Sequence, residues 1–339
     1  MSSSSRYFFG SLTRIAPFQH EPFEVQEIDR SQWATGDYVV AEVLSRSRDL
    51  GRVELPNGRH AEVQEGDLVV GAWGHRSATL EAVGSWTAIG EDGRFQGLTS
   101  AGLFGKATST SRLLPPLVTL GYRGHVTVDG RPRRMADYVA PAPAVELTAP
   151  VVLIIGTSMT SGKTTAGKIL IHMLVEQGVR VAGVKLTGAG RYRDILSMDD
   201  AGAAAIFDFV DVGLPSTVCP EEEFKPLQEQ LLARVAAAEP DVVVVEAGAS
   251  PLEPYNGAAA VERLSPLVRC TVLCAADPYA AFGVREAFPV PTDLVSGLAT
   301  STSAAIDLVG KLTGLPAINV LDRASHPELR RFLLDRLQL

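Results

Sequence analysis

A loop suited to binding phosphate follows an apolar run near the middle of the chain. Residues 151–155 predict a buried strand, and Gly162, Lys163 and Thr164 stand between this run and a stretch of helical periodicity. In a strand–loop–helix of this kind, backbone N–H groups hold phosphate oxygens, the lysine reaches the β- and γ-phosphates, and the threonine hydroxyl ligates Mg²⁺. The residues predicted to contact a nucleotide here are Gly156, Thr157, Ser158, Met159, Thr160, Ser161, Gly162, Lys163, Thr164 and Thr165.

The glycine spacing of this loop departs from the strict pattern G-x-x-x-x-G-K-[ST]. Thr157 stands where that pattern has its first glycine, and Gly156 lies one residue earlier. A glycine- and serine-rich turn with an incidental lysine is the alternative. The register of strand, loop and helix favours the phosphate-binding loop.

Acidic residues at two later points could complete a magnesium site. Glu246 ends the apolar run 241–245, at the edge of a parallel sheet where ligands bind. Asp199 and Asp200 follow the strand predicted over 179–186 and open a predicted helix. We therefore predict Mg²⁺ ligation by Thr164, Glu246 and one or both aspartates, with helix capping as the alternative role of the acids.

Basic side chains next to this edge point to an acidic substrate. Lys185 ends a buried strand, where an ammonium group is costly unless it meets an anion. Arg191 and Arg193 flank Tyr192 in a glycine-containing segment after that strand, and this predicts a loop that captures carboxylate or phosphate. Snorkelling of the side chain to solvent is the alternative for Lys185, and a solvated loop is the alternative for the two arginines.

The nucleotide base is less well defined. GTPases with a phosphate-binding loop of this kind carry the motif N-K-x-D at the place of residues 292–299. These residues do not match the motif, which favours ATP over GTP. Asn319, at a later predicted strand end, is a candidate for base contacts. His75, in a turn with Arg76, is a candidate for reaching the nucleotide site from the N-terminal half.

The elements that must position these residues alternate between strands and helices after residue 150. This order predicts a doubly wound, mostly parallel α/β sheet covered on both faces. The predicted strands are 151–155, 179–186, 241–245, 268–275, 292–295 and 317–320. The predicted helices are 163–177, 199–209, 223–238, 258–265, 301–313 and 326–337.

The N-terminal half has a different texture. It carries all three tryptophans and reads as short strands separated by turns, with hairpin signals at 56–58 and 129–130 and no helix of 12 or more residues between 36 and 140. We predict a β-rich domain over residues 1–140, a small barrel or sandwich. A proline-rich linker, 141–150, joins it to a nucleotide-binding domain over 151–339.

Composition excludes several classes of protein. The 339 residues are 46% hydrophobic and 21% charged with a net charge of −8, so the chain is globular and a poor nucleic-acid binder. No apolar stretch reaches the length of a membrane span, and the first residues lack a signal-peptide core. Three cysteines make no disulfide framework, and Cys270 and Cys274 lie in a strand as buried thiols. We expect a cytoplasmic protein.

The loop and the two strand ends together resemble dethiobiotin synthetase and its superfamily, the SIMIBI class of P-loop proteins. Residues 156–164 are similar to that family's G-T-D-x-x-x-G-K-T loop, residues 184–188 to its lysine-bearing strand end, and residues 245–249 to its V-E-G-A-G segment. Residues 246–254 also resemble an E-G-Q-G-S-x-x-x-P run in a bacterial P-loop group linked to N-acylation of D-glutamate. The resemblance implies that Lys185 and Thr187 contact substrate, that an aspartate near Asp200 binds metal, and that the protein is a homodimer.

Three functions are compatible with these residues. The first is an enzyme that uses Mg²⁺ and ATP to activate a small acid (a carboxylate, amino acid or carbamate) by kinase- or ligase-like phosphoryl transfer, with Lys163, Lys185 and Glu246 as catalytic residues. The second is a nucleotide-switched binding or cofactor-delivery NTPase. The third, an inactive scaffold, is disfavoured by the intact Lys163, Thr164 and Glu246. Ser158 and the β-rich half depart from dethiobiotin synthetase, which argues against biotin synthesis itself.

Overall fold

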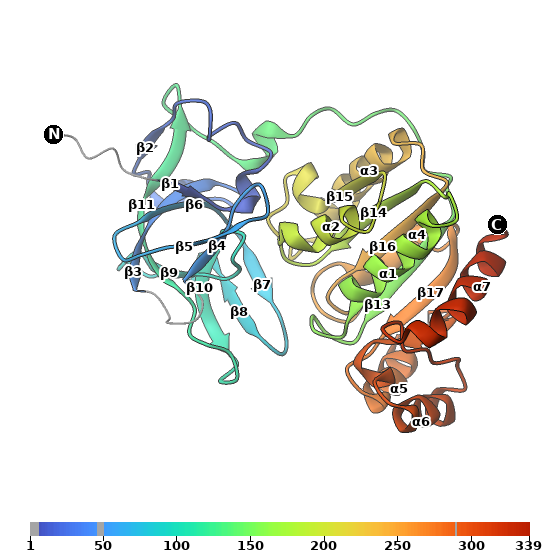
Figure 1. The fold of residues 1–339 in the computed structure, drawn as a ribbon. Coiled ribbons are helices and arrows are strands. Elements are labelled where there is room, and N and C mark those ends of the chain that lie inside the picture. The colour runs from blue at the N-terminus through green and yellow to red at the C-terminus, as the bar shows by residue number, and fades with distance from the viewer. Residues whose placement is uncertain (1–6, 46–50, 289) are drawn as a thin grey trace. The chain divides into compact units, whose positions relative to one another are not determined.

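The computed structural model describes residues 7–45, 51–288 and 290–339 and divides into two compact units (Figure 1). Residues 1–141, 189–193 and 209–219 form the first unit, and residues 142–188, 194–208 and 220–339 form the second. The predicted division placed everything after residue 150 in one domain. It differs from the observed units in two short segments, 189–193 and 209–219, which pack with the N-terminal half. Residues 1–6, on which the expectation of no signal peptide partly depends, lie outside the described residues.

Paired strands in the first unit close on themselves. β6 pairs with both β3 and β10, so that β6, β3, β11, β9 and β10 form a closed ring, which is the topology of a barrel. The predicted hairpins are present: β4–β5 turns through 56–58, and β11–β12 turns at Asp129 and Gly130, both with positive φ. The strands are β1 (Tyr7–Phe9), β2 (Glu24–Gln26), β3 (Tyr38–Ser45), β4 (Arg52–Glu54), β5 (His60–Glu62), β6 (Leu68–Trp73), β7 (His75–Ser77), β8 (Ala82–Ser85), β9 (Arg94–Gly97), β10 (Leu103–Thr110), β11 (Thr119–Val128) and β12 (Arg131–Pro132).

The ring encloses an aromatic and β-branched core. Trp73, Phe95 and Phe104 are fully buried and contact one another through tilted and edge-on rings. Alternate residues of β3 point into the same core, as the period of a strand requires.

The second unit contains a six-stranded parallel sheet in the order β15-β14-β16-β13-β17-β18. Figure 1 labels the strands of this sheet from β15 to β17. The predicted α/β architecture is thus present in this unit, and its helices, among the described residues, are too short or too polar to cross a bilayer. The strands are β13 (Val151–Gly156), β14 (Val181–Thr187), β15 (Ala205–Asp208), β16 (Val242–Ala247), β17 (Val268–Cys274) and β18 (Leu294–Ser296). The helices are α1 (Lys163–Val175), α2 (Tyr192–Asp199), α3 (Glu221–Ala237), α4 (Gly257–Leu264), α5 (Pro278–Ala287), α6 (Ser303–Thr313) and α7 (His326–Leu337), of which α2 begins in segment 189–193.

The two faces of this sheet are both apolar because its strands are nearly continuous runs of valine, isoleucine and leucine. Even-numbered residues of the central strands β13 and β16 pack against α1 and α7. On β14 and β16, α3 and α4 supply further contacts. A sheet covered on both faces leaves its carboxyl edge as the place where polar side chains can gather.

Two predicted elements differ from the structure, and one helix of the structure was not predicted. The helix predicted over 199–209 is wrong: α2 ends at Asp199, and residues 205–208 form strand β15, paired with β14. The predicted strand 317–320 is only a single bridge between Val295 and Ala317. Helix α5 was not predicted; Asp277 caps it by accepting hydrogen bonds from Tyr279 and Ala280.

The buried cysteines lead to a first testable expectation. Burial raises the pKa of both Cys270 and Cys274 to about 12, while Cys219 is partly exposed. At pH 8, each of the two buried thiols would be in its reactive thiolate form in about one molecule in 10⁴. We expect iodoacetamide to modify the folded protein at Cys219 alone, and all three cysteines in guanidinium, as measured by peptide mass spectrometry. Equally fast modification of Cys270 in the folded protein would contradict this expectation.

Candidate functional site

The loop between β13 and α1 has the backbone of a phosphate-binding loop. Gly162 precedes the helix in a left-handed conformation (φ 100°), which favours glycine, and α1 begins at Lys163. A Cβ on Gly156 would collide with the side chains of Ser161 and Lys163, so this position also requires glycine. Thr157 connects the loop to the segment that follows β17, because its Oγ1 accepts a hydrogen bond from Ala276 N (3.0 Å).

Lys163 is buried at the centre of this loop. Its side chain is 2% exposed, and its Nζ donates to the carbonyl oxygens of Ser158 (2.6 Å) and Ala249 (2.7 Å). Burial lowers the pKa of Lys163, whereas the negative charge of Glu246 opposes this shift. A buried ammonium at the N-terminus of a helix is suited to meet an anion.

Glu246 and Thr164 come together from different elements. Glu246 lies near the end of β16, and Thr164 lies in the first turn of α1; Thr164 Oγ1 donates to Glu246 Oε2 (2.9 Å). Burial raises the pKa of Glu246, and the charges of Lys185 and Lys163 oppose the shift. A buried carboxylate beside a hydroxyl provides two oxygen ligands of the type that Mg²⁺ prefers.

A second buried lysine lies on the neighbouring strand. Lys185, on β14, pairs in register with Glu246 on β16 and with Asp208 on β15, so the three residues form one row across the sheet. Its Nζ forms an ion pair with Asp194 Oδ2 (2.6 Å), in the first turn of α2. Lys185 and Asp194 are 6% and 18% exposed in this pair, so neither charge is fully solvated.

Not every predicted ligand joins this cluster. Asp199 and Asp200 are exposed at the C-terminal end of α2 rather than at the start of a helix. Of the four predicted magnesium ligands, the structure brings together Thr164 and Glu246. Within the described residues, no group of three His, Cys, Asp or Glu side chains is arranged to hold a metal ion.

Two other predicted contact residues have local hydrogen bonds. Thr187 is buried, and its hydroxyl donates to the carbonyl oxygen of Gly248. Asn319 Oδ1 accepts a hydrogen bond from Leu321 N (3.0 Å). This bond closes a local turn between Asn319 and Leu321.

Arg191, Arg193 and His75 belong to the first unit. The loop predicted around Arg191 and Arg193 is partly wrong, because Tyr192 and Arg193 already form the first turn of α2. Both arginines line a cavity in the first unit. The ring of His75 contacts Thr35 Oγ1 (3.3 Å), and burial lowers the pKa of this histidine.

Sequence reasoning missed Asp194 and Asp208. Asp208 was hidden inside a predicted helix, although an acid that ends a short β-rich run is a recognisable signal. Asp194 lies nine residues after a lysine in an apolar strand. A buried lysine needs an anionic partner, and this requirement was the signal that pointed to a nearby acidic residue such as Asp194.

Comparisons with known proteins add little at the level of sequence. No protein-family model matches the chain. No curated protein sequence matches it either.

Solved structures that resemble the chain are P-loop NTPases of the SIMIBI class. HypB from Helicobacter pylori, solved in complex with nickel, is 16% identical over 56% of this chain and 88% of its own, with a TM-score of 0.37. The signal recognition particle receptor FtsY from Elizabethkingia anophelis is 14% identical over 52% of this chain and 59% of its own, with a TM-score of 0.36. A ParA family ATPase from Chlorobium tepidum is 16% identical over 56% of this chain and 92% of its own, with a TM-score of 0.32. The chain thus spans little more than half of FtsY, and the narrower resemblance to dethiobiotin synthetase stays a prediction.

Proposed function

We propose that the second unit binds ATP with Mg²⁺ and transfers the γ-phosphoryl group to a small acid. The observation that carries this proposal is the pair of buried lysines at one edge of the sheet, Lys163 in the phosphate-binding loop and Lys185 two strands away, with Glu246 between them. The lysine of a phosphate-binding loop serves the phosphates of the nucleotide. The second cation suits an anionic acceptor.

Lys163 is suited to the β- and γ-phosphates. Within the described part of the chain, its ammonium donates to two carbonyl oxygens, and these partners are weaker than phosphate oxygens. The N–H groups of the loop and of the first turn of α1 add donors without a desolvation cost of their own.

The residues at the helix start also fit a magnesium ion. Thr164 and Glu246 provide one hydroxyl and one carboxylate, which is as many protein ligands as Mg²⁺ commonly takes beside phosphate and water. When bound, the ion would neutralise charge on the phosphate oxygens during transfer.

Lys185 is suited to orient the acceptor. Asp194 holds its ammonium, and Asp208 and Glu246 flank it in register, so the position of the charge is fixed before any substrate arrives. A carboxylate oxygen of the acceptor would attack the γ-phosphorus. The bond from phosphorus to the β–γ bridging oxygen would break, releasing ADP and an acyl phosphate.

The test is a screen for ADP release from ATP in the presence of small carboxylic and amino acids, with trapping of acyl phosphate by hydroxylamine. We expect at least one acid to stimulate ADP release and to form a hydroxamate. We expect Lys185→Met to lose this stimulation while keeping ATP affinity within about threefold, because Lys185 acts on the acceptor. Hydrolysis that no acid stimulates would support a nucleotide-switched NTPase instead.

A further inference from the structure

The first unit contains a cavity of about 430 Å³ that the proposed phosphoryl transfer does not use. It is bordered by the β4–β5 hairpin, strands β6 and β10, the chain that enters β11, and segment 189–193. Its described lining residues all belong to the first unit. The volume is within the range of small-molecule sites, roughly 300–1,000 Å³.

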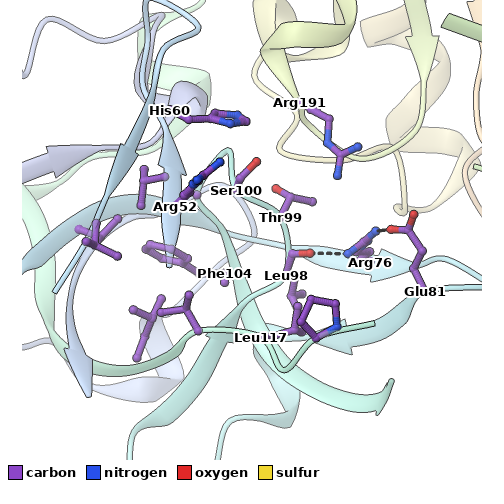
Figure 2. A pocket seen from close by; sticks show the side chains of 18 of the residues that line it. Arg52, His60, Arg76, Glu81, Leu98, Thr99, Ser100, Phe104, Leu117 and Arg191 are labelled. Atoms are coloured by element: carbon purple, nitrogen blue, oxygen red, sulfur yellow. Dashed lines mark hydrogen bonds and ion pairs between the residues drawn. The ribbon is translucent and has the colours of Figure 1, made fainter. Parts of the chain in front are cut away.

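One side of the cavity is apolar. Val63, Val69 and Phe104 are buried residues of its wall, and Leu117, from the segment between β10 and β11, also lines it. Figure 2 shows Phe104 and Leu117 on the side away from His60. Protein interiors contain few voids of this size, because each uncovered apolar atom loses contacts. The wall is therefore suited to the apolar body of a ligand.

The other side is positively charged. Figure 2 shows His60, Arg52 and Arg191 together on the side opposite Leu117, with Ser100 between them. Arg76 and Arg193 also line the cavity, and Glu81 is the one acidic residue among the described residues that line it. Among the described lining residues, four arginines thus outnumber one glutamate, in a chain whose net charge is −8.

Three carboxylates around the cavity, from residues that the structure describes, already have partners. Glu81 forms an ion pair with Arg76, and Glu62 Oε1 lies 3.5 Å from Arg52 Nη2. Glu54 is buried and accepts hydrogen bonds from Ser11 Oγ (2.6 Å) and from the backbone N–H groups of Tyr192 and Arg193. Among the residues that the structure describes, Arg191 and Arg193 have no carboxylate within ion-pair distance.

The backbone on both sides of Arg191 is fixed. Gly190 donates to Pro215 O (3.1 Å) and accepts from Thr99 Oγ1 (3.2 Å), and Tyr192 N donates to Glu54 (2.9 Å). A guanidinium on a fixed backbone loses less entropy on binding than one on a mobile loop.

We propose that this cavity is a binding site for a small organic anion, with an apolar body against Phe104 and Leu117 and a carboxylate or phosphate head bound by Arg191. An arginine fork binds either head group through two parallel hydrogen bonds. The apolar wall excludes a purely polar anion as the preferred ligand.

Calorimetry on the full chain, without nucleotide, tests this site separately from the proposed phosphoryl transfer. The probes are 3-phenylpropionate, its neutral counterpart 3-phenylpropan-1-ol, 2-phenylethyl phosphate, and acetate as a head group without a body. We expect 3-phenylpropionate or 2-phenylethyl phosphate to bind at least about tenfold more tightly than the alcohol and than acetate. The tighter of the two anions identifies the head group.

Variants locate the binding. Arg191→Gln should weaken binding of the tighter anion by about tenfold and leave the affinity for the alcohol unchanged. The reason is that only the anion binds to the guanidinium. Arg94→Gln, an exposed arginine of the same unit outside the cavity lining, is the matched control and should bind like the original protein. Leu117→Trp, at a half-buried position, should abolish binding of every phenyl probe by filling the cavity.

Three results would overturn the proposal. They are equal affinity for the acid, the phosphate and the alcohol; unchanged anion binding by both Arg191→Gln and Leu117→Trp in folded protein; and no heat of binding for any phenyl probe at 5 mM. Circular dichroism of each variant establishes that it is folded.

Discussion

Replacing Lys163 by alanine is expected to abolish ATP-dependent phosphoryl transfer while leaving the fold intact. Lys163 is the buried cation of the phosphate-binding loop, and its removal takes away a preorganised charge that stabilises the transferring phosphoryl group. We expect a loss on the order of 10³-fold in the rate of ADP formation, measured by a coupled assay. The fold should persist because the apolar contacts of α1 with β13 and β16 do not involve the ammonium.

Lys168→Ala is the matched control for this variant. Lys168 is exposed on the same helix, so its removal changes the net charge and the helix sequence to the same extent without touching the loop. We expect Lys168→Ala to keep the full rate. Near-normal turnover by Lys163→Ala would show that the loop is not the nucleotide site.

Replacing Glu246 by glutamine is expected to weaken magnesium-dependent turnover on the order of 10²-fold, by analogy with the loss of one preorganised electrostatic group. Glutamine has nearly the same shape and can still accept the hydrogen bond from Thr164 Oγ1, so the local structure should persist. What it lacks is the negative charge that faces a cation. The rate should therefore be measured against Mg²⁺ concentration, and nucleotide affinity should be measured without Mg²⁺, where we expect little change.

Asp199→Asn and Asp200→Asn separate two placements of the metal site. The sequence favoured these residues as ligands, but both are exposed at the end of α2. We expect both variants to keep the Mg²⁺ dependence of the original protein. If Glu246→Gln kept it and either aspartate variant lost it, the metal would have to be bound at α2 instead.

Sequence patterns were most informative where local and tertiary preferences agree. The valine-rich strands β13 and β16, the helix after Gly162, and the two glycine-containing hairpins were predictable because apolar runs and turn residues have few alternative structures. The alanine-rich stretch around 201–205 has high helix propensity, yet pairing of β15 with β14 overrides that preference.

Side-chain partners across the sheet were harder to predict. Lys185 was recognised as a charge that needs a counter-ion, but its partner Asp194 depends on where α2 begins, and element boundaries are set by tertiary contacts. The cavity of the first unit could not be predicted from the sequence for a similar reason. Its wall combines residues near 52–63, 98–104, 114–120 and 191–193, and no local pattern joins them.

The two late segments of the first unit have a consequence for biosynthesis. Residues 189–193 and 209–219 contribute contacts that the N-terminal strands cannot make by themselves, among them the ion pair of Arg14 with Asp211 and the hydrogen bond from Ser216 to His75 O. A nascent chain therefore has to extend to residue 219 of 339 before the first unit has all of its parts. Contacts that distant in sequence raise the contact order and slow folding. Cutting the chain at the proline-rich linker would leave the N-terminal product without these two segments.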